Sequence, residues 1–165
     1  MGVNDGARSF DGTFTAPPDA RFAIVAARFN GSVVEGLLGG AREALRKHGV
    51  PDAQVSVTRV PGAWEIPLAC KWLCGKGEVD VVIALGAVIR GGTPHFEYVA
   101  GAAAQGCMQA SMESGVPVIF GVLTTDDLEQ AVARAGARES NKGWDEGLAA
   151  LEMLMLGRTL GEAGA

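Results

Sequence analysis

The sequence predicts an α/β fold of three layers, α/β/α, with four parallel strands in the middle layer and helices on both sides. Two patterns support this prediction. Apolar runs of strand length alternate along the chain with longer segments whose apolar residues recur at helical spacing. Most of the strand-length runs are apolar almost throughout, which is typical of strands that helices cover on both faces. Strands that alternate with helices favour a parallel sheet.

Four segments are predicted to form the core strands. Three of them, RFAIVAARF, VDVVIALGAVI and VPVIFGVLT, are nearly continuous apolar runs, whereas AQVSVTRV alternates between apolar and polar residues. In chain order the core strands are expected at residues 21–29, 53–60, 79–89 and 116–124. A further segment, SFDGTFT at residues 9–15, is predicted to be a short N-terminal edge strand that needs a partner.

Five segments are predicted to be helices, at residues 31–50, 63–77, 95–115, 126–136 and 141–160. The first has one apolar face, made of Val34, Leu37, Leu38, Ala41 and Leu45. Gly49 is placed to cap its C-terminal end. Pro67 is compatible with the second helix only near its start. Asp126 and Glu129 form a capping-box pattern at the start of the fourth.

The chain is expected to be one domain over residues 1–165, with residues 1–9 flexible. Its 165 residues, 48% of them hydrophobic, are ordinary for one folded domain. The net charge of −5 argues against a nucleic-acid partner. No apolar run reaches the ~18–20 residues of a membrane span, and the first residues lack the pattern of a secretory leader. We therefore expect a cytoplasmic protein.

The cysteines are expected to be core thiols in a reducing compartment. Cys70 and Cys74 are four residues apart and would share a helix face, and Cys107 lies in the next predicted helix. A metal site would need further Cys or His residues at matching spacing, and none are near in the sequence. The sequence therefore predicts no metal site.

The loops that follow the predicted strands are the expected place for a ligand. In open parallel sheets, ligands bind beyond the carboxyl ends of the strands. Each of these loops carries an aromatic, turn-forming or ionisable residue, in the stretches RFN at 28–30, PGAWE at 61–65, IRGGTPH at 89–95 and GVLTTDD at 121–127. This coincidence indicates one functional site at that end of the sheet.

The third loop, 89–95, has the composition of an anion-binding turn. Gly91 and Gly92 allow backbone N–H groups to turn towards a ligand, Thr93 adds a hydroxyl, and a helix N-terminus follows. The alternative is a glycine turn that only connects a strand to a helix. There is no Walker A or G-x-G-x-x-G motif, so this is not a standard nucleotide loop. His95 either transfers protons beside the anion or is a surface residue at the helix start.

Two other residues, Phe29 and Glu65, also have alternative interpretations, whereas His48 has one. Phe29 is either a core residue or a stacking platform for a flat ring. Glu65 either binds the hydroxyl groups of a sugar or sits in the first turn of its helix. His48, beside Lys47 at a helix end, is expected to interact with the helix dipole. Without further information, the residues predict a phosphate-ligand α/β enzyme or a flavodoxin-like binder.

Five stretches together resemble the 6,7-dimethyl-8-ribityllumazine synthase family. They are ARFN, VPGAWEIPLA, GAVIRGGTPHFEYVA, VIFGVLTTDDLEQAVARAG and NKGWDEGLAALEM, in family order between about residues 10 and 160. The resemblance implies a flavodoxin-like fold and the penultimate step of riboflavin biosynthesis. In this step 5-amino-6-ribitylamino-pyrimidinedione condenses with 3,4-dihydroxy-2-butanone 4-phosphate. The lumazine, phosphate and water form, and no metal or organic cofactor is needed.

The resemblance also implies roles for individual residues. His95 corresponds to the proposed acid–base residue, Arg134 to the arginine that clamps the phosphate, and Lys142 to a second cation near the site. Phe29 corresponds to the aromatic that stacks on the pyrimidine, and Phe120 to an aromatic lent by the neighbouring subunit. The remaining residues implied in contacts with the ring, the ribityl chain or the phosphate are Ala63, Trp64, Glu65, Ala87, Val88, Ile89, Gly92 and Thr93.

Three residues depart from the family's usual pattern. Asp145 stands where many relatives have glutamate, so its reach and its role are open. Gly92 replaces a common alanine in the phosphate turn, and Ala102 stands where an acidic residue is frequent.

The resemblance implies an assembly as well as a reaction. Family members form pentamers, some of which build 60-subunit shells, and riboflavin synthase is considered as a further partner. The eight-residue separation of Arg134 and Lys142, without an insertion, and the segment DGTF at 11–14 favour the shell. Two alternatives are a flavin-binding module without turnover and a purely structural shell. The presence of His95, Arg134 and Lys142 together favours the enzyme.

Overall fold

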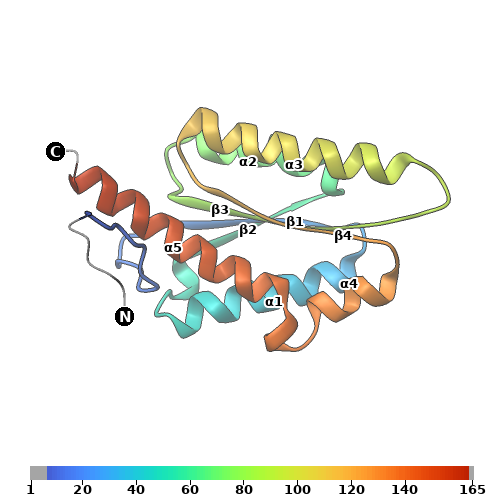
Figure 1. Cartoon of the computed structure of the whole chain (residues 1–165), viewed down its shortest axis with the longest axis horizontal. Coiled ribbons are helices and arrows are strands. Elements are labelled where there is room, and N and C mark those ends of the chain that lie inside the picture. Colours follow the sequence, from blue (N-terminus) through green and yellow to red (C-terminus); the bar gives the residue numbers. More distant parts are fainter. Residues whose placement is uncertain (1–6, 164–165) are drawn as a thin grey trace.

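A parallel four-stranded sheet lies between two layers of helices in the computed structural model, which describes residues 7–163 (Figure 1). The strands are β1 (Phe22–Ala27), β2 (Val55–Val60), β3 (Val81–Ile89) and β4 (Val118–Thr125), in the order β2-β1-β3-β4. One helical layer holds α2 (Ile66–Gly75) and α3 (His95–Ser114). The other holds α1 (Gly31–Lys47), α4 (Leu128–Ala135) and α5 (Lys142–Ala163). The prediction of a parallel α/β/α sandwich is confirmed.

The two middle strands form the centre of the core, because helices cover them on both faces. All six residues of β1 and eight of the nine residues of β3 are buried, which explains their continuous apolar sequences. In β2, an edge strand, most residues are half-buried or exposed, which explains its alternating sequence. Within residues 7–163, no helix has the length and apolar character needed to span a membrane.

The first helix has the apolar face that its sequence predicts. The buried residues of α1 include the whole predicted set, Val34, Leu37, Leu38, Ala41 and Leu45. The helix ends at Lys47, and Gly49 follows with φ +87°, a left-handed conformation that favours glycine. His48 Nδ1 lies 2.7 Å from the carbonyl oxygen of Ala44, in the last turn of the helix. The histidine is therefore at the negative end of the helix, as predicted.

Residues 9–15 do not form the predicted edge strand in this single chain. The segment instead lies beside α5, where Gly12 contacts the backbone of Glu152 (Figure 1). It packs on the helical layer and does not reach an edge of the sheet, so its backbone has no strand to pair with. The prediction that residues 1–9 are flexible falls largely outside the described residues.

The cap of the fourth helix lies one residue later than the sequence predicts. Asp127, not Asp126, accepts a hydrogen bond from the backbone N–H of Gln130 at 2.8 Å. The Gln130 side chain in turn accepts from the backbone N–H of Asp126 at 3.0 Å. The Asp126 carboxylate is engaged elsewhere, since it accepts a hydrogen bond from Arg90. The predicted capping pair of Asp126 and Glu129 was therefore wrong by one residue at each position.

All three cysteines are free and buried, which confirms that they are core thiols. Cys70 and Cys74 lie on α2 and Cys107 lies on α3, in the layer that covers one face of the sheet. Burial raises the pKa of the Cys74 thiol, and a hydrogen bond with Ser114 partly opposes this effect.

Helices α1 and α5 approach so closely that a glycine is needed at their contact. A methyl group on Gly143 would overlap the carbonyl oxygen of Leu37 in α1. Asn141, just before α5, is buried, and its Nδ2 lies 3.0 Å from the carbonyl oxygens of Gly36 and Gly136. These bonds join α1, the end of α4 and the start of α5.

Replacing Gly143 with alanine tests this close contact. We expect Gly143→Ala to lower the free energy of unfolding by about 1–3 kcal/mol, because the added methyl group forces α1 and α5 apart. Gly157→Ala is the matched control on α5, since nothing lies within 4 Å of its added methyl group. The control should be neutral or stabilising by up to ~1 kcal/mol. Urea unfolding that gives equal stability for the two variants would contradict the contact.

Candidate active site

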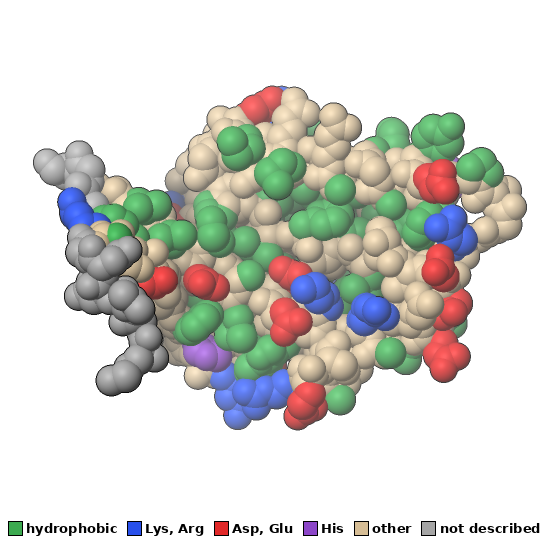
Figure 2. Space-filling view, in the orientation of Figure 1, with side chains coloured by type: hydrophobic (Ala, Val, Ile, Leu, Met, Phe, Trp, Pro, Cys, Tyr) green, Lys and Arg blue, Asp and Glu red, His purple; other side chains and the backbone are tan. Residues whose placement is uncertain are grey.

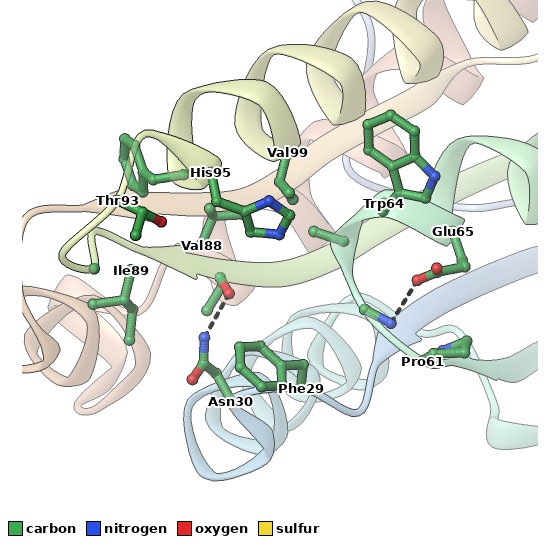
Figure 3. A pocket seen from close by; sticks show the side chains of 15 residues that line it. Phe29, Asn30, Pro61, Trp64, Glu65, Val88, Ile89, Thr93, His95 and Val99 are labelled. Carbon is green, nitrogen blue, oxygen red and sulfur yellow. Dashed lines mark hydrogen bonds between the residues drawn. The ribbon is translucent and has the colours of Figure 1, made fainter.

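A cavity of about 410 Å³ opens beyond the carboxyl ends of β1, β2 and β3 (Figure 3). The loops that follow these three strands line it, as the sequence predicts for an open parallel sheet. Most of the predicted site residues meet there, namely Phe29, Ala63, Trp64, Glu65, Ala87, Val88, Ile89, Thr93 and His95. The volume is within the range of small-molecule sites.

The cavity has two facing walls. His95 and Val99 project from α3 on one side, and Phe29 and Asn30 lie on the other, with Val88 on the strand between them (Figure 3). Phe29 is 72% exposed, so it is not a core residue. Its ring is available to a flat ligand, which favours the stacking interpretation over the core one.

Asn30 is a cavity residue that the sequence analysis did not single out. Its side-chain amide donates from Nδ2 to the carbonyl oxygen of Ala87 at 2.8 Å. Its backbone has φ +56°, the positive value of a left-handed conformation that asparagine tolerates better than most residues. The sequence feature that could have indicated this residue is an asparagine directly after a predicted buried strand. The bond ties the loop after β1 to the end of β3.

The same loop is fixed on its other side by the end of β2. The backbone N–H of Arg28 donates to the carbonyl oxygen of Val60 at 2.8 Å, and that of Phe29 donates to Pro61 at 3.0 Å. Pro61 and Gly62 also line the cavity and were missed as individual residues, although the loop that holds them was selected. These backbone bonds therefore hold the part of the loop from which the Phe29 ring projects.

Glu65 both closes a turn and faces the cavity. It ends a short 3₁₀ helix, Ala63–Glu65, directly before α2, and its Oε2 accepts a hydrogen bond from the backbone N–H of Gly62 at 2.9 Å. This bond fits the interpretation of a first-turn residue. The carboxylate is exposed at the cavity edge, so a ligand hydroxyl can also reach it.

The turn between β3 and α3 lies at one end of the cavity. Gly91 and Thr93 line the cavity, whereas Gly92 lies between them without doing so. Neither glycine has a positive φ, and nothing lies within 4 Å of an added methyl group on either. The glycines therefore leave open space there and do not serve an unusual backbone conformation. His95 begins α3, so the positive end of the helix dipole faces this space.

Phe120, Arg134 and Lys142 lie outside the cavity of their own chain. Phe120 is on the edge strand β4, and Arg134 is near the end of α4, where its Nη1 donates to the carbonyl oxygen of Gln130 at 3.3 Å. Lys142 begins α5. The fold thus brings the other predicted site residues, except Gly92, together at the cavity but leaves Phe120, Arg134 and Lys142 outside it.

Glu146 is a buried carboxylate that the sequence analysis missed. It lies 3.2 Å from the ammonium of Lys142, closer than Asp145 at 4.0 Å. Burial raises the pKa of the Glu146 carboxyl, and the hydrogen bond from Lys142 opposes that rise. Lys142 therefore has Glu146 as its main partner, and the aspartate that departs from the family pattern is secondary.

The pH dependence of the unfolding free energy of a Glu146 variant tests whether the carboxyl has a raised pKa. A pKa above the ~4.3 of a free glutamate means that the folded protein binds this proton more tightly than the unfolded chain does. Stability from this group is present below about pH 4 and is lost as the pH rises through the raised pKa. The unfolding free energy of Glu146→Gln minus that of the wild type should therefore increase between about pH 4 and pH 7. A difference that stays constant in urea unfolding would contradict the raised pKa, and Asp145→Asn is the exposed neighbouring control.

The fold and the cavity define a class of protein, an α/β protein with a small-molecule cavity beyond the carboxyl ends of its strands, lined by an exposed phenylalanine, a histidine and part of a glycine turn. The sequence profile of the family described as 6,7-dimethyl-8-ribityllumazine synthase matches residues 19–158. A 6,7-dimethyl-8-ribityllumazine synthase of Halorhodospira halophila is 53% identical over 150 residues, which cover 91% of this chain and 96% of that protein. The chain belongs to the 6,7-dimethyl-8-ribityllumazine synthase family, and it is an enzyme of riboflavin biosynthesis.

Proposed function

We propose that this chain condenses 5-amino-6-ribitylamino-pyrimidinedione with 3,4-dihydroxy-2-butanone 4-phosphate to give 6,7-dimethyl-8-ribityllumazine, phosphate and water. The observation that carries the proposal is that one cavity has Phe29, Glu65, Gly91, Thr93 and His95 on its walls. It offers an aromatic platform for a ring, a carboxylate for hydroxyl groups and an anion-binding helix start within one space.

The two substrates occupy different ends of the cavity. The pyrimidine stacks on Phe29, and the backbone of β3 at Ala87, Val88 and Ile89 contacts the edge of the ring. The ribityl chain extends along Ala63–Glu65, where the Glu65 carboxylate accepts from its hydroxyls. The phosphate of the second substrate occupies the turn at 91–93, where Gly92 and Thr93 offer backbone N–H groups and a hydroxyl.

The reaction needs proton transfers that His95 can provide. The pyrimidine amine attacks the ketone, and the carbinolamine loses water to give an imine. Phosphate then leaves, the enol tautomerises to a ketone, and the second nitrogen attacks this carbonyl and closes the ring with loss of a second water. An imidazole at the cavity wall can give and take protons in these steps. Because both substrates are reactive, much of the acceleration comes from holding them together.

Replacing His95 with alanine tests this assignment. We expect turnover to fall by ~10–10³-fold, as for a typical acid–base group, with the fold intact. His48→Ala is the control, since His48 lies at the far end of α1 and outside the cavity. Lumazine formation would be followed by fluorescence in steady state. Equal rates for the two variants would remove His95 from the chemistry.

We also propose that Phe120, Arg134 and Lys142 serve the cavity of a neighbouring chain. Their position outside their own cavity supports this, and so do apolar surfaces at both edges of the sheet. Beside β2, Trp72 of α2 is 63% exposed, and beside β4, Met112 of α3 is 77% exposed. Apolar side chains gather across the face where β4 lies between α3 and α5 (Figure 2). Two different surfaces that meet head to tail form a ring when the rotation between neighbouring chains closes.

We propose that this ring is a pentamer and that pentamers build the 60-subunit shell. The short connection between Arg134 and Lys142 supports the shell. We further propose the cytoplasm as the site of action, because three buried free thiols suit a reducing compartment, and riboflavin synthase as the acceptor of the product.

Mixing two inactive variants tests the shared site. His95→Ala and Arg134→Ala should each be slow alone. After joint refolding in equal amounts, about a quarter of the sites should combine a native His95 with a native Arg134 of the adjacent chain. Activity of the mixture should then exceed the mean of the separate variants. If it does not, His95 and Arg134 act within one chain, or Arg134 does not act at all.

A further inference from the structure

Arg90 makes contacts from the start of the glycine turn to two other segments. It follows β3 directly, and its Nε donates to Oδ1 of Asp126, in the loop after β4, at 2.9 Å. Its Nη1 lies 3.7 Å from Oε1 of Glu97 in the first turn of α3. Its guanidinium carbon lies 4.5 Å from the centre of the Phe96 ring, a cation–π contact. One side chain therefore connects β3, α3 and the β4–α4 loop.

Arg90 does not line the cavity, but the residues around it do. Gly91, Thr93, His95 and Phe96 all lie on the cavity wall. The guanidinium packs on Phe96 and thereby supports the turn of α3 that carries His95. The backbone N–H of Arg90 also donates to the carbonyl oxygen of Thr125 at 2.9 Å, which fixes the end of β3 against β4.

The glycine turn depends on restraints at its two ends. Gly91 and Gly92 have open space around them, and glycine has the greatest backbone freedom of all residues. The contacts of Arg90 restrain the turn at its start, and α3 restrains it at its end. An anion that binds to backbone N–H groups needs them held in place before it arrives, since ordering a mobile turn on binding lowers affinity.

The contribution of these contacts to stability is small. The side chains of Arg90 and Asp126 are 47% and 69% exposed, and exposed ion pairs stabilise folded proteins very little. The geometry is more specific than a stability role requires, because one guanidinium contacts the Asp126 carboxylate, the Glu97 carboxylate and the Phe96 ring at the same time.

We propose that Arg90 is a positioning residue for the anion end of the cavity. By joining Asp126, Phe96 and Glu97, it fixes the 91–93 turn and His95 for a phosphate monoester, here the phosphorylated four-carbon ketone. The inference rests on the proposed function for the identity of that substrate. It does not require Arg90 to touch the ligand.

Steady-state kinetics of Arg90→Gln test the proposal against a matched control. Arg42 forms an ion pair with Asp52 at 3.2 Å, with exposed fractions of 48% and 69%, and lies away from the cavity, so Arg42→Gln removes an equivalent surface pair. Arg90→Gln should raise KM for the phosphorylated ketone roughly tenfold and leave KM for the pyrimidinedione within about twofold. The Tm should match that of Arg42→Gln. The exchange Arg90→Asp with Asp126→Arg should recover part of the loss.

Two outcomes would overturn the proposal. Either Arg90→Gln has the kinetics of Arg42→Gln, or KM rises equally for both substrates together with a fall in Tm, which would mean a general structural defect. If the wild type shows no turnover above the spontaneous reaction, the proposed function fails separately. Calorimetric titration with inorganic phosphate then decides the role of Arg90. Weaker binding to Arg90→Gln than to Arg42→Gln supports the proposal, and equal binding by these two variants overturns it.

Discussion

The parallel pairing of β1 on both of its edges is the constraint on which the site depends. In this register Ala27 lies opposite Val60 of β2, and Ala26 lies opposite Leu85 of β3. The carboxyl ends of three neighbouring strands therefore meet at one edge of the sheet. Because β3 continues to Ile89, its last residues extend past the end of β1 and form the floor of the cavity. The loops that follow the strands therefore lie around that floor.

The loops keep their places through backbone bonds more than through side-chain packing. The loop after β1 is bonded to β2 through the carbonyl oxygens of Val60 and Pro61, and to β3 through the Asn30 side chain and Ala87. This fixes the backbone that carries the exposed Phe29 ring. An exposed ring on a restrained loop and a helix-start histidine suit an enzyme that works largely by holding two reactive substrates together.

The sequence was sufficient for the layers and for most of the cavity because both depend on local patterns. Continuous apolar runs predicted β1 and β3, and the loops selected at 28–30, 61–65 and 89–95 contain eleven of the fifteen lining residues. The errors concern which of several possible partners a side chain or a segment contacts in the folded chain. Arg90 engages Asp126, so Asp127 caps α4 instead, and residues 9–15 lie beside α5 without a strand partner. The burial of Glu146, which pairs with the exposed Lys142, depends on how α5 faces β4, and helical spacing alone does not specify this.

The most direct test of the account is the rate of lumazine formation by the purified wild-type protein. The ribitylamino-pyrimidinedione and the butanone phosphate would be mixed with the protein, and product fluorescence would be compared with the spontaneous reaction. Turnover should exceed that background and should fall when inorganic phosphate competes for the turn at 91–93. A folded protein that gives only the background rate would contradict this prediction.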